Sequence, residues 1–242
     1  MVGMHSEVGN FRKSNQDYIG FFQCDDGGVY VIADGMGGYA GGEVASKIAV
    51  ETVISAFKDV NTADVDDEFI RSVVDSCNEA IIEMGKLDQS LQGMGTTLTL
   101  CFINKNKGIV ANIGDSCCYI LSKDVFYKLT KDHSLVQVFV DSGNLTEEEA
   151  KKHPNKNIIT RSLGTTEKVE SDIYFIDVDE NDKIMLCTDG LSNHIDNDVM
   201  REVLLKLDII EAVKELVDLS KKNGSKDNIS VMVFKGECQD DR

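Results

Sequence analysis

Apolar residues recur along this chain with two different spacings. Short apolar runs of strand length lie at 18–22, 29–33, 96–103, 108–113, 117–121, 125–129, 171–178, 183–188 and 229–235. Apolar residues that repeat every three or four positions, the spacing of one helix face, lie at 43–58, 65–87, 197–206 and 208–222. The first spacing predicts strands and the second predicts amphipathic helices.

The order of these predicted elements indicates the fold class. Strands, two helices, a run of strands, an irregular part, two strands, two helices and a last strand do not alternate as βαβ units do. We therefore predict an α+β fold in which antiparallel sheets pack face to face, with pairs of helices outside. No repeat or linker divides the chain, so we expect a single domain over 1–242.

The irregular part, at about 132–164, is polar and predicts a small insert in this domain. Short helices are expected at 134–142 and 146–152. Thr146 and Glu149 have the spacing of a capping box at the start of the second one, and Pro154 ends it. Turns are predicted at 25–28, 104–107 and 122–124, where glycine and polar residues separate apolar runs.

Composition and charge narrow the function. The chain has 242 residues and a net charge of −17, which argues against binding to nucleic acid or to an anionic membrane surface. It has no apolar signal core and no run approaching a membrane span. Its cysteines number seven, an odd count, with no CxxC pair. We therefore expect a cytoplasmic protein with free thiols.

Three aspartates stand at the ends or beginnings of apolar strands. Asp34 and Asp189 are each followed by glycine after such a run, and Asp227 comes just before the last strand. A carboxylate beside a buried strand is costly unless something positive lies against it. A single Asp-Gly pair is usually only a turn. Three such aspartates together favour a cluster that binds a hard cation such as magnesium or manganese.

Further candidates lie near other strand ends. Asp17 precedes the strand predicted at 18–22, and Asp115 follows the strand at 108–113. Arg12 offers a planar fork that suits a phosphate, although it could equally be an exposed surface arginine. Cys-x5-Arg, GxxxxGK[ST], HExxH and GxSxG are all absent, and the four histidines are scattered. The aspartates near the strand ends are therefore the remaining candidates for a catalytic or metal-binding role.

Eight motifs in order resemble those of the metal-dependent serine/threonine phosphatases of the protein phosphatase 2C type, in their compact bacterial form. They are RKSNQD (12–17), ADGMGGYAGGEVAS (33–46), GMGTTL (93–98), ANIGDS (111–116), LTKDHS (129–134), ITRSLG (159–164), CTDGLSN (187–193) and KDNIS (226–230). The resemblance implies a four-layer αββα sandwich of two stacked antiparallel sheets flanked by helix pairs. The insert at 132–164 matches the flap beside the family's active site.

The resemblance also implies a binuclear manganese or magnesium centre between the sheets. By likeness, Asp34 bridges both ions, the Gly35 carbonyl binds one, and Asp189 and Asp227 hold the other. Asp115, together with Asp189, matches the position of a weaker third ion. Asp17 would orient the attacking water and Arg12 would hold the substrate phosphate.

The implied activity is hydrolysis of phosphoserine and phosphothreonine in proteins by direct attack of a water that bridges the two ions. Such chemistry needs no covalent phosphoenzyme. The implied partners are phosphorylated proteins, including a Ser/Thr kinase and its substrates, and the enzyme is expected to be a monomer. Two alternatives stay open: an inactive binding module of the same fold, and a metal-dependent hydrolase of another phosphoester, such as a nuclease.

Three positions depart from the family pattern. Met36 stands where animal members carry a histidine proposed as the general acid, which leaves the source of the leaving-group proton open. Tyr39 stands where bacterial relatives often have histidine, and Cys117 replaces the arginine that often follows the GDS motif. None of these positions is a metal ligand by resemblance, so hydrolysis itself is still expected.

Overall fold

The computed structural model of the chain describes residues 1–24 and 27–236. Its strands form two antiparallel sheets. The sheet named here the β11 sheet has the order β1 (Val2–Glu7), β11 (Ile229–Lys235), β10 (Lys183–Cys187), β7 (Cys117–Ser122) and β8 (Val125–Lys128). The β3 sheet has the order β2 (Asp17–Cys24), β3 (Gly27–Met36), β5 (Leu98–Asn104), β6 (Lys107–Ile113) and β9 (Asp172–Asp177), with β4 (Gly95–Thr96) paired to β3.

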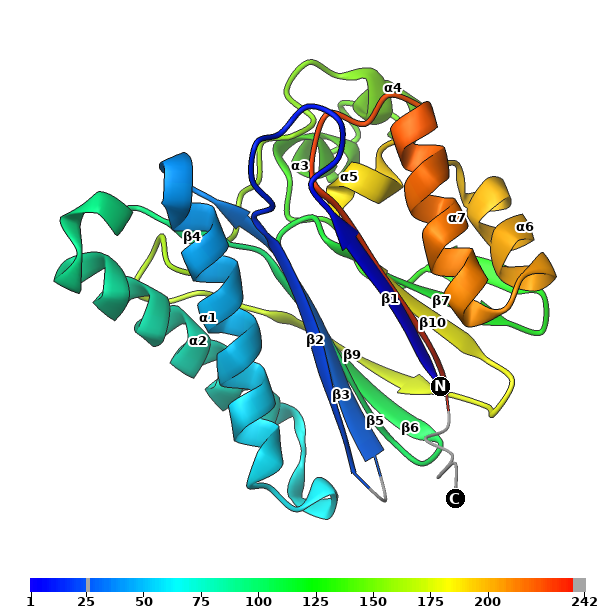
Figure 1. The fold of residues 1–242 in the computed structure, drawn as a ribbon, viewed down its shortest axis with the longest axis horizontal. Helices are drawn as coiled ribbons and strands as arrows, with labels where there is room; N and C mark the ends of the chain where they lie inside the picture. The colour runs from blue at the N-terminus through cyan, green and yellow to red at the C-terminus, as the bar shows by residue number, and fades with distance from the viewer. Residues whose placement is uncertain (25–26, 237–242) are drawn as a thin grey trace.

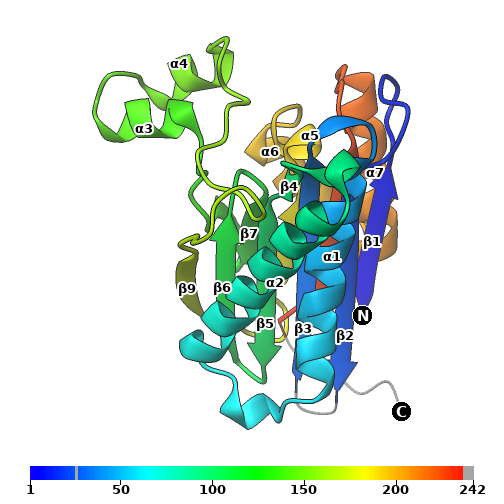
Figure 2. The same cartoon turned by 90° about the vertical axis from the view of Figure 1, so that its left-hand side faces the viewer.

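Helix pairs cover the outer face of each sheet (Figures 1 and 2). Helices α1 (Gly38–Lys58) and α2 (Asp67–Leu87) pack on the β3 sheet, and α6 (Asn197–Lys206) and α7 (Ile209–Lys222) pack on the β11 sheet. Two short 3-10 helices, η1 (Thr62–Asp64) and η2 (Gln89–Leu91), flank α2. This arrangement confirms the predicted α+β class and its layered order.

Three apolar layers hold the four structural layers together. One lies between each sheet and its helices, and the third lies between the two sheets. In the middle layer the rings of Tyr30 and Phe234 stack with centroids 3.6 Å apart. Because β3 and β11 are covered on both faces, nearly every residue in them is buried. This burial explains why both strands are continuous apolar runs in the sequence.

The insert contains α3 (Leu135–Asp141) and α4 (Glu147–Lys152), close to the predicted bounds. Figure 2 shows both helices projecting beyond the end of the sheets. The predicted capping box is present: Glu149 N–H donates to Thr146 Oγ1 at 3.2 Å, and Thr146 N–H donates to Glu149 Oε2 at 2.8 Å. Here local chemistry alone fixes the helix start.

Three elements differ from the prediction. Strand β1 was not predicted, so the strand expected first is the second one. Helix α1 begins at Gly38 rather than at 43, and α5 (Asp189–Ser192) follows β10 directly. Of the turn predicted at 25–28, residues 25 and 26 lie outside the described residues, and Gly27 and Gly28 already belong to β3. No helix in the described ranges is both long and apolar enough to cross a membrane.

Candidate metal centre

The candidate aspartates come from both sheets and meet at one end of the sandwich. Asp17 begins β2 and lies directly opposite Asp34 of β3 in the antiparallel register. Asp189 is the first residue of α5, at the end of β10, and Asp227 lies two residues before β11. Because β10 and β11 are neighbours, the β11 sheet brings these two aspartates to the same edge.

Asp17 is the most buried of these carboxyl groups, with 5% of its surface exposed. Its Oδ2 accepts hydrogen bonds from Thr188 Oγ1 at 2.9 Å and from Ser230 Oγ at 2.6 Å. Its Oδ1 is buried and has no hydrogen-bond partner in the described part of the chain. Loss of hydration raises the pKa of Asp17 to about 7, even though both hydroxyls favour the ionised form.

The other carboxyl groups are crowded together in the same way. Burial and then the negative charge of Asp227 raise the pKa of Asp189 to about 6. Burial also raises the pKa of Asp34 well above its usual value, as do the charges of Asp17 and Asp189. The pKa of Asp115 is likewise raised by burial and by Asp189. Like charges therefore face each other across the two sheets.

This arrangement fits a hard cation. Asp189 Oδ1, like Asp17 Oδ1, is buried without a hydrogen-bond partner among the described residues, and an unpaired buried carboxylate oxygen is costly. In the described ranges, no three Asp, Glu, His or Cys side chains stand where they could hold one ion together. Magnesium keeps several waters and needs only one or two protein carboxylates per ion, so such a pattern is compatible with it.

Backbone contacts fix the position of Asp34. Its N–H donates to Thr97 Oγ1 at 2.9 Å, and its carbonyl accepts from Thr97 N–H at 2.9 Å and from Thr96 Oγ1 at 2.9 Å. The next residue, Gly35, has no room for a side chain, since a Cβ there would lie 2.0 Å from the Gly42 carbonyl oxygen. The close approach of α1 to β3 therefore requires glycine at this point.

Arg12 lies in the loop between β1 and β2, with 52% of its side chain exposed. The side chain is exposed, as the surface reading expects, and its Nη2 donates to Asp227 Oδ2 at 2.8 Å. This hydrogen bond raises the pKa of Arg12. The guanidinium thus stands at the aspartate cluster, as a phosphate-binding role requires.

Sequence reasoning missed the residue that holds this loop. Asn228 is buried, its Oδ1 accepts from Gln16 N–H at 2.9 Å, and its Nδ2 donates to the carbonyls of Val8 and Ser14 at 3.0 Å each. One side chain therefore ties the Arg12 loop to the start of β11. Asn228 lies inside the motif KDNIS, but an amide beside a strand is common and by itself indicates no role.

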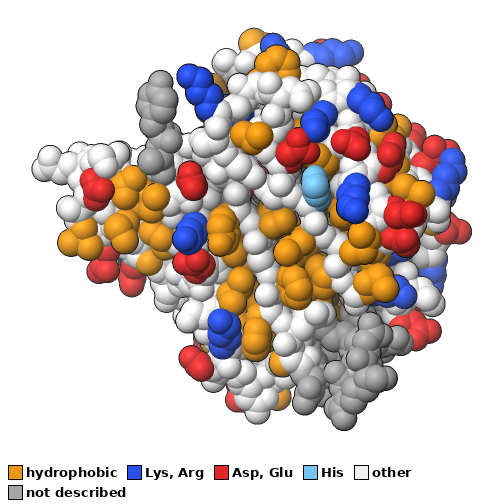
Figure 3. Space-filling model, in the orientation of Figure 1, with side chains coloured by type: hydrophobic (Ala, Val, Ile, Leu, Met, Phe, Trp, Pro, Cys, Tyr) orange, Lys and Arg blue, Asp and Glu red, His pale blue; other side chains and the backbone are white. Residues whose placement is uncertain are grey.

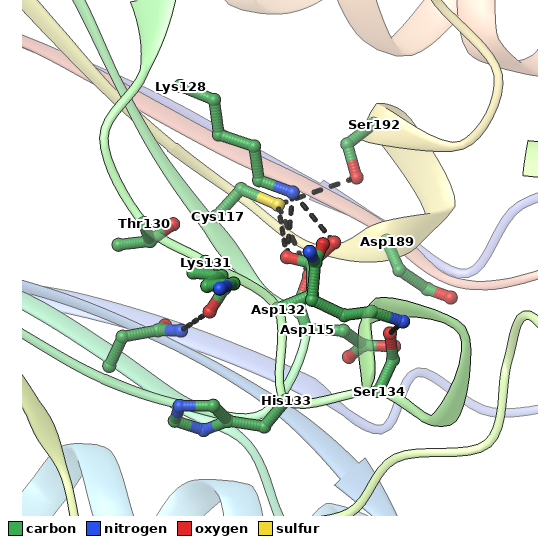
Figure 4. A network of polar contacts seen from close by, with 12 residues as sticks. Asp115, Cys117, Lys128, Thr130, Lys131, Asp132, His133, Ser134, Asp189 and Ser192 are labelled. Carbon is green, nitrogen blue, oxygen red and sulfur yellow. Dashed lines mark hydrogen bonds and ion pairs between the residues drawn. The ribbon is translucent and has the colours of Figure 1, made fainter. Parts of the chain in front are cut away.

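A second missed cluster lies beside Asp115 (Figure 4). Lys128 Nζ contacts both carboxylate oxygens of Asp132, at 2.6 and 2.8 Å. The Sγ of Cys117 lies 3.2 Å from the Asp115 carbonyl oxygen and 3.7 Å from Asp132 Oδ1. The charge of Asp132 contributes to the raised pKa of both Asp115 and Asp189. The first residue of the insert therefore belongs electrostatically to the aspartate cluster.

A family model described as protein phosphatase 2C matches residues 7–231. The serine/threonine phosphatase stp of Listeria monocytogenes is 35% identical over 239 residues, which cover 95% of each chain. The solved S. agalactiae serine/threonine phosphatase superposes with a TM-score of 0.91 at 32% identity, covering 98% of this chain and 99% of the other.

A further solved structure contains metal. The catalytic domain of the serine/threonine protein phosphatase PstP, in complex with two manganese ions, superposes with a TM-score of 0.86 at 31% identity, and 96% of each chain is covered. The match of the family model spans nearly all of the chain, from β1 to β11. On these grounds the chain belongs to the protein phosphatase 2C family.

Proposed function

We propose that this protein is a metal-dependent phosphatase that removes phosphate from phosphoserine and phosphothreonine in proteins. The observation that carries the proposal is the aspartate cluster, in which buried carboxylate oxygens of Asp17 and Asp189 have no partner among the described residues. Serine/threonine phosphatases that match the chain over nearly its full length support the substrate class.

Asp34, the Gly35 carbonyl, Asp189 and Asp227 are the proposed ligands of two divalent ions. The presence of two manganese ions in PstP supports this assignment. We propose manganese or magnesium, since both take oxygen ligands. A third, weaker ion is proposed at Asp115 and Asp189, whose charges already act on each other. Two protein carboxylates leave most of an ion's positions to water, which accounts for the weak binding.

The bound ions supply charge neutralisation of the phosphate and a water of lowered pKa for the attack on phosphorus. The side chains of Asp17 and Arg12 orient the attacking water and the substrate phosphate. Asp17 is held at Oδ2 by two hydroxyls, and its Oδ1 is left to accept a hydrogen bond from the attacking water. Arg12 has N–H groups beyond the one given to Asp227, and these can bind the phosphate. Met36 ends β3 and has no proton to donate to the leaving oxygen.

We further propose that 1–242 forms a single catalytic domain in which 132–164 is the flap. The protein is proposed to act as a monomer in the cytoplasm, on phosphoproteins that include a Ser/Thr kinase and its substrates. Free cysteines support a reducing compartment: all six in the described residues are unpaired, and Cys238 lies outside these residues.

The alternative metal-dependent hydrolase is a nuclease. The net charge of −17 repels a nucleic-acid backbone. On the face shown in Figure 3, lysine and arginine side chains are scattered singly among acidic and uncharged ones. A basic stripe, which phosphate-backbone tracking requires, is not seen on that face. An inactive binding module is disfavoured because Asp34, Asp189 and Asp227 are all present.

The decisive experiment measures phosphate release from a phosphothreonine peptide with manganese, with magnesium and with chelator. Single-stranded DNA, duplex DNA and p-nitrophenyl phosphate serve as the other substrates. The proposal expects metal-dependent release from the peptide and from p-nitrophenyl phosphate, and none from DNA. Cleavage of DNA, or no hydrolysis of any ester with either metal, would overturn it.

Asp189→Asn tests the site within the same assay. The substitution removes one charge from the cluster and keeps the size of the side chain, so the protein should fold while metal-dependent hydrolysis is lost. Its fold is checked by circular dichroism, and its thermal midpoint without metal should equal or exceed that of the wild type. Near-native turnover in manganese would show that the ligands are assigned wrongly.

A further inference from the structure

His133 stands at the start of the flap and has 6% of its side chain exposed. It makes two hydrogen bonds to a single residue of the β6–β7 turn. The N–H of His133 donates to the Gly114 carbonyl at 2.9 Å, and the N–H of Gly114 donates to His133 Nδ1 at 3.1 Å. Gly114 immediately precedes Asp115, so this pair of bonds holds the backbone from which the Asp115 side chain extends.

The second bond fixes the state of the imidazole. Since Nδ1 accepts a hydrogen bond, the neutral ring carries its proton on Nε2. That nitrogen lies 3.2 Å from Asp172 Oδ2 at the start of β9. Arg161 Nη1 also lies 3.2 Å from Nε2 and pairs with Asp172 Oδ1 at 2.8 Å. The Asp172 carboxylate thus orients the ring so that Nδ1 faces Gly114.

His133 also joins the two ends of the flap. Its carbonyl accepts the N–H of Thr160 at 2.7 Å, and Ser134 forms an isolated bridge with Ile159. Arg161, which follows Thr160, forms the ion pair with Asp172. One residue therefore links the outgoing chain of the flap, its returning chain and the turn that carries Asp115.

The turn is fixed from the opposite side as well. Gly114 has a φ of +100°, and a Cβ there would lie 2.5 Å from Thr97 Cγ2. Thr97 is the residue whose hydroxyl accepts the N–H of Asp34, and it also bonds Ser116 at 2.8 Å. The Asp115 backbone is thus held between the Asp34 strand and the flap, and Nδ1 of His133 is a buried acceptor on the flap side.

We infer that His133 is a positioning residue: its Nδ1 holds the Gly114–Asp115 turn in the conformation that receives the weaker third ion, and it couples that ion to the flap. This rests on the proposed function, in which Asp115 is a ligand of that ion. The two ring nitrogens have different roles. Nδ1 binds the Gly114 N–H directly, whereas Nε2 contacts Asp172 and thereby only sets the orientation of the ring.

Three substitutions distinguish the nitrogens. His133→Asn places an amide oxygen near the position of Nδ1 and keeps the acceptor for Gly114 N–H. His133→Gln places a donor near the position of Nε2 and loses that acceptor, and His133→Ala loses both. His153→Ala is the matched control, because His153 is a flap histidine whose Nδ1 accepts only a local bond, from Asn155 N–H at 3.2 Å.

Two readouts are measured. The first is hydrogen exchange of the Gly114 amide in the metal-free protein, followed by NMR, which requires no activity. The second is calorimetric titration with manganese alone. His133→Ala and His133→Gln should expose the Gly114 amide to exchange and weaken the weakest manganese site by about 10- to 100-fold, the usual effect of losing a group that orients a ligand. His133→Asn and His153→Ala should resemble the wild type in both measurements.

The inference fails if the His133→Gln and His133→Asn variants behave alike. It also fails if His133→Ala leaves both the manganese affinity of the weak site and the exchange rate of the Gly114 amide unchanged. If His133 had only a structural role, the His133→Asn and His133→Gln variants would be destabilised equally. The comparison of these two variants is therefore informative even if His133→Ala does not fold. If the wild type binds no third ion yet releases phosphate with manganese, the inference falls while the proposed function stands. If the wild type releases no phosphate with either metal, the proposed function itself falls.

Discussion

At the scale of single residues, the site is built around carboxylates that the protein satisfies only in part. Asp17 receives two hydroxyl donors on Oδ2 and none on Oδ1. A buried oxygen left without a partner costs about 1–3 kcal/mol, and a chain selected for stability alone would avoid it. Asp189 Oδ1 is likewise buried without a partner among the described residues. The metal-free cluster should therefore lower the stability of the fold, and a bound cation should restore it.

Arg12→Ala should raise KM at least as much as it lowers kcat, because the guanidinium is proposed to bind the substrate phosphate. The expected loss in kcat/KM is about 1.5–3 kcal/mol, the range for a hydrogen bond to a charged group. Metal affinity should not weaken, since Arg12 Nη2 occupies Asp227 Oδ2 in the present structure. Steady-state kinetics and manganese titration measure both effects.

Lys13→Ala is the control for Arg12, because Lys13 is the adjacent exposed cation. It should leave KM unchanged if the effect belongs to the guanidinium rather than to the general positive charge of the loop. Unaltered kinetics in Arg12→Ala would return Arg12 to the role of a structural ion-pair partner of Asp227.

Asp115→Ala should keep two tightly bound manganese ions and lose a weaker third, and it should lower turnover of phosphopeptides. The reason is that Asp115 is proposed to share this ion only with Asp189, and the neighbouring Asp132 carboxylate is already paired with Lys128. Calorimetric titration should show one weak site fewer than in the wild type. Identical titration curves with unchanged phosphopeptide turnover would leave Asp115 as a turn residue.

At this scale the sequence predicted the charged groups better than the groups that hold them. Asp34, Asp189 and Asp227 could be chosen as candidates because an acidic residue beside an apolar strand is unusual, and the structure places them near one another. Thr188, Ser230 and Asn228 could not, since hydroxyl and amide side chains beside strands are common and carry no such signal. Their role depends on which strands become neighbours, and that is a property of the sheets.

At the scale of elements, local signals succeeded where the element is decided locally. The capping box of α4 and the long amphipathic stripe of α2 were predicted within a few residues. The start of α1 was not, because Gly38, Gly41 and Gly42 have poor helix propensity. Close packing of the Gly42 backbone against Gly35 overrides that preference, since no larger residue fits there.

Strand β1 shows the opposite failure. Its residues, VGMHSE, include a glycine, a histidine and a glutamate and form no apolar run. It is the edge strand of its sheet, with β11 as its strand partner, so its other edge is not covered by a strand. Such a strand needs less hydrophobic character than a central one. The register places Met4 opposite Met232 and Ser6 opposite Ser230, which makes pairing rather than composition the cause of the strand.

The flap should be the least stable large element. Many residues of 135–156 are exposed, α3 and α4 are short, and the polar bonds that tie the flap to the sheets gather at its base near His133. Hydrogen exchange followed by mass spectrometry should show rapid exchange over the flap and slow exchange over β3 and β11. Protection of the flap equal to that of the sheets would contradict this view.

At the scale of the whole molecule, the aspartate cluster lies at the junction of the two sheets, which pack on each other through the apolar layer around Tyr30 and Phe234. Asp17 and Asp34 come from strands of one sheet, and Asp189 and Asp227 lie just beyond the ends of β10 and β11 in the other. Without cations, like charges oppose each other at this junction. The stability of the entire sandwich should therefore depend on the ionisation of the cluster and on metal.

The metal-free protein should lose stability as pH rises from about 5 to 8. In the folded state the pKa is about 7 for Asp17 and about 6 for Asp189. Both lie above the value of about 3.9 expected in the unfolded chain. The folded state therefore binds more protons between these values, and its advantage disappears as pH rises through the folded pKa. Manganese binds the ionised form, so it should stabilise the protein increasingly over the same range.

Thermal midpoints from pH 5 to 8, in chelator and in manganese, measure both trends. Asp17→Asn is the control for the general effect of a net charge of −17, because it removes one titrating group of the cluster and changes the overall charge by only one. Its metal-free midpoint should fall less steeply with pH than that of the wild type. A wild-type midpoint that rises with pH in chelator would mean that the aspartates are already ionised at no cost, and the cluster would then be no strained cation site.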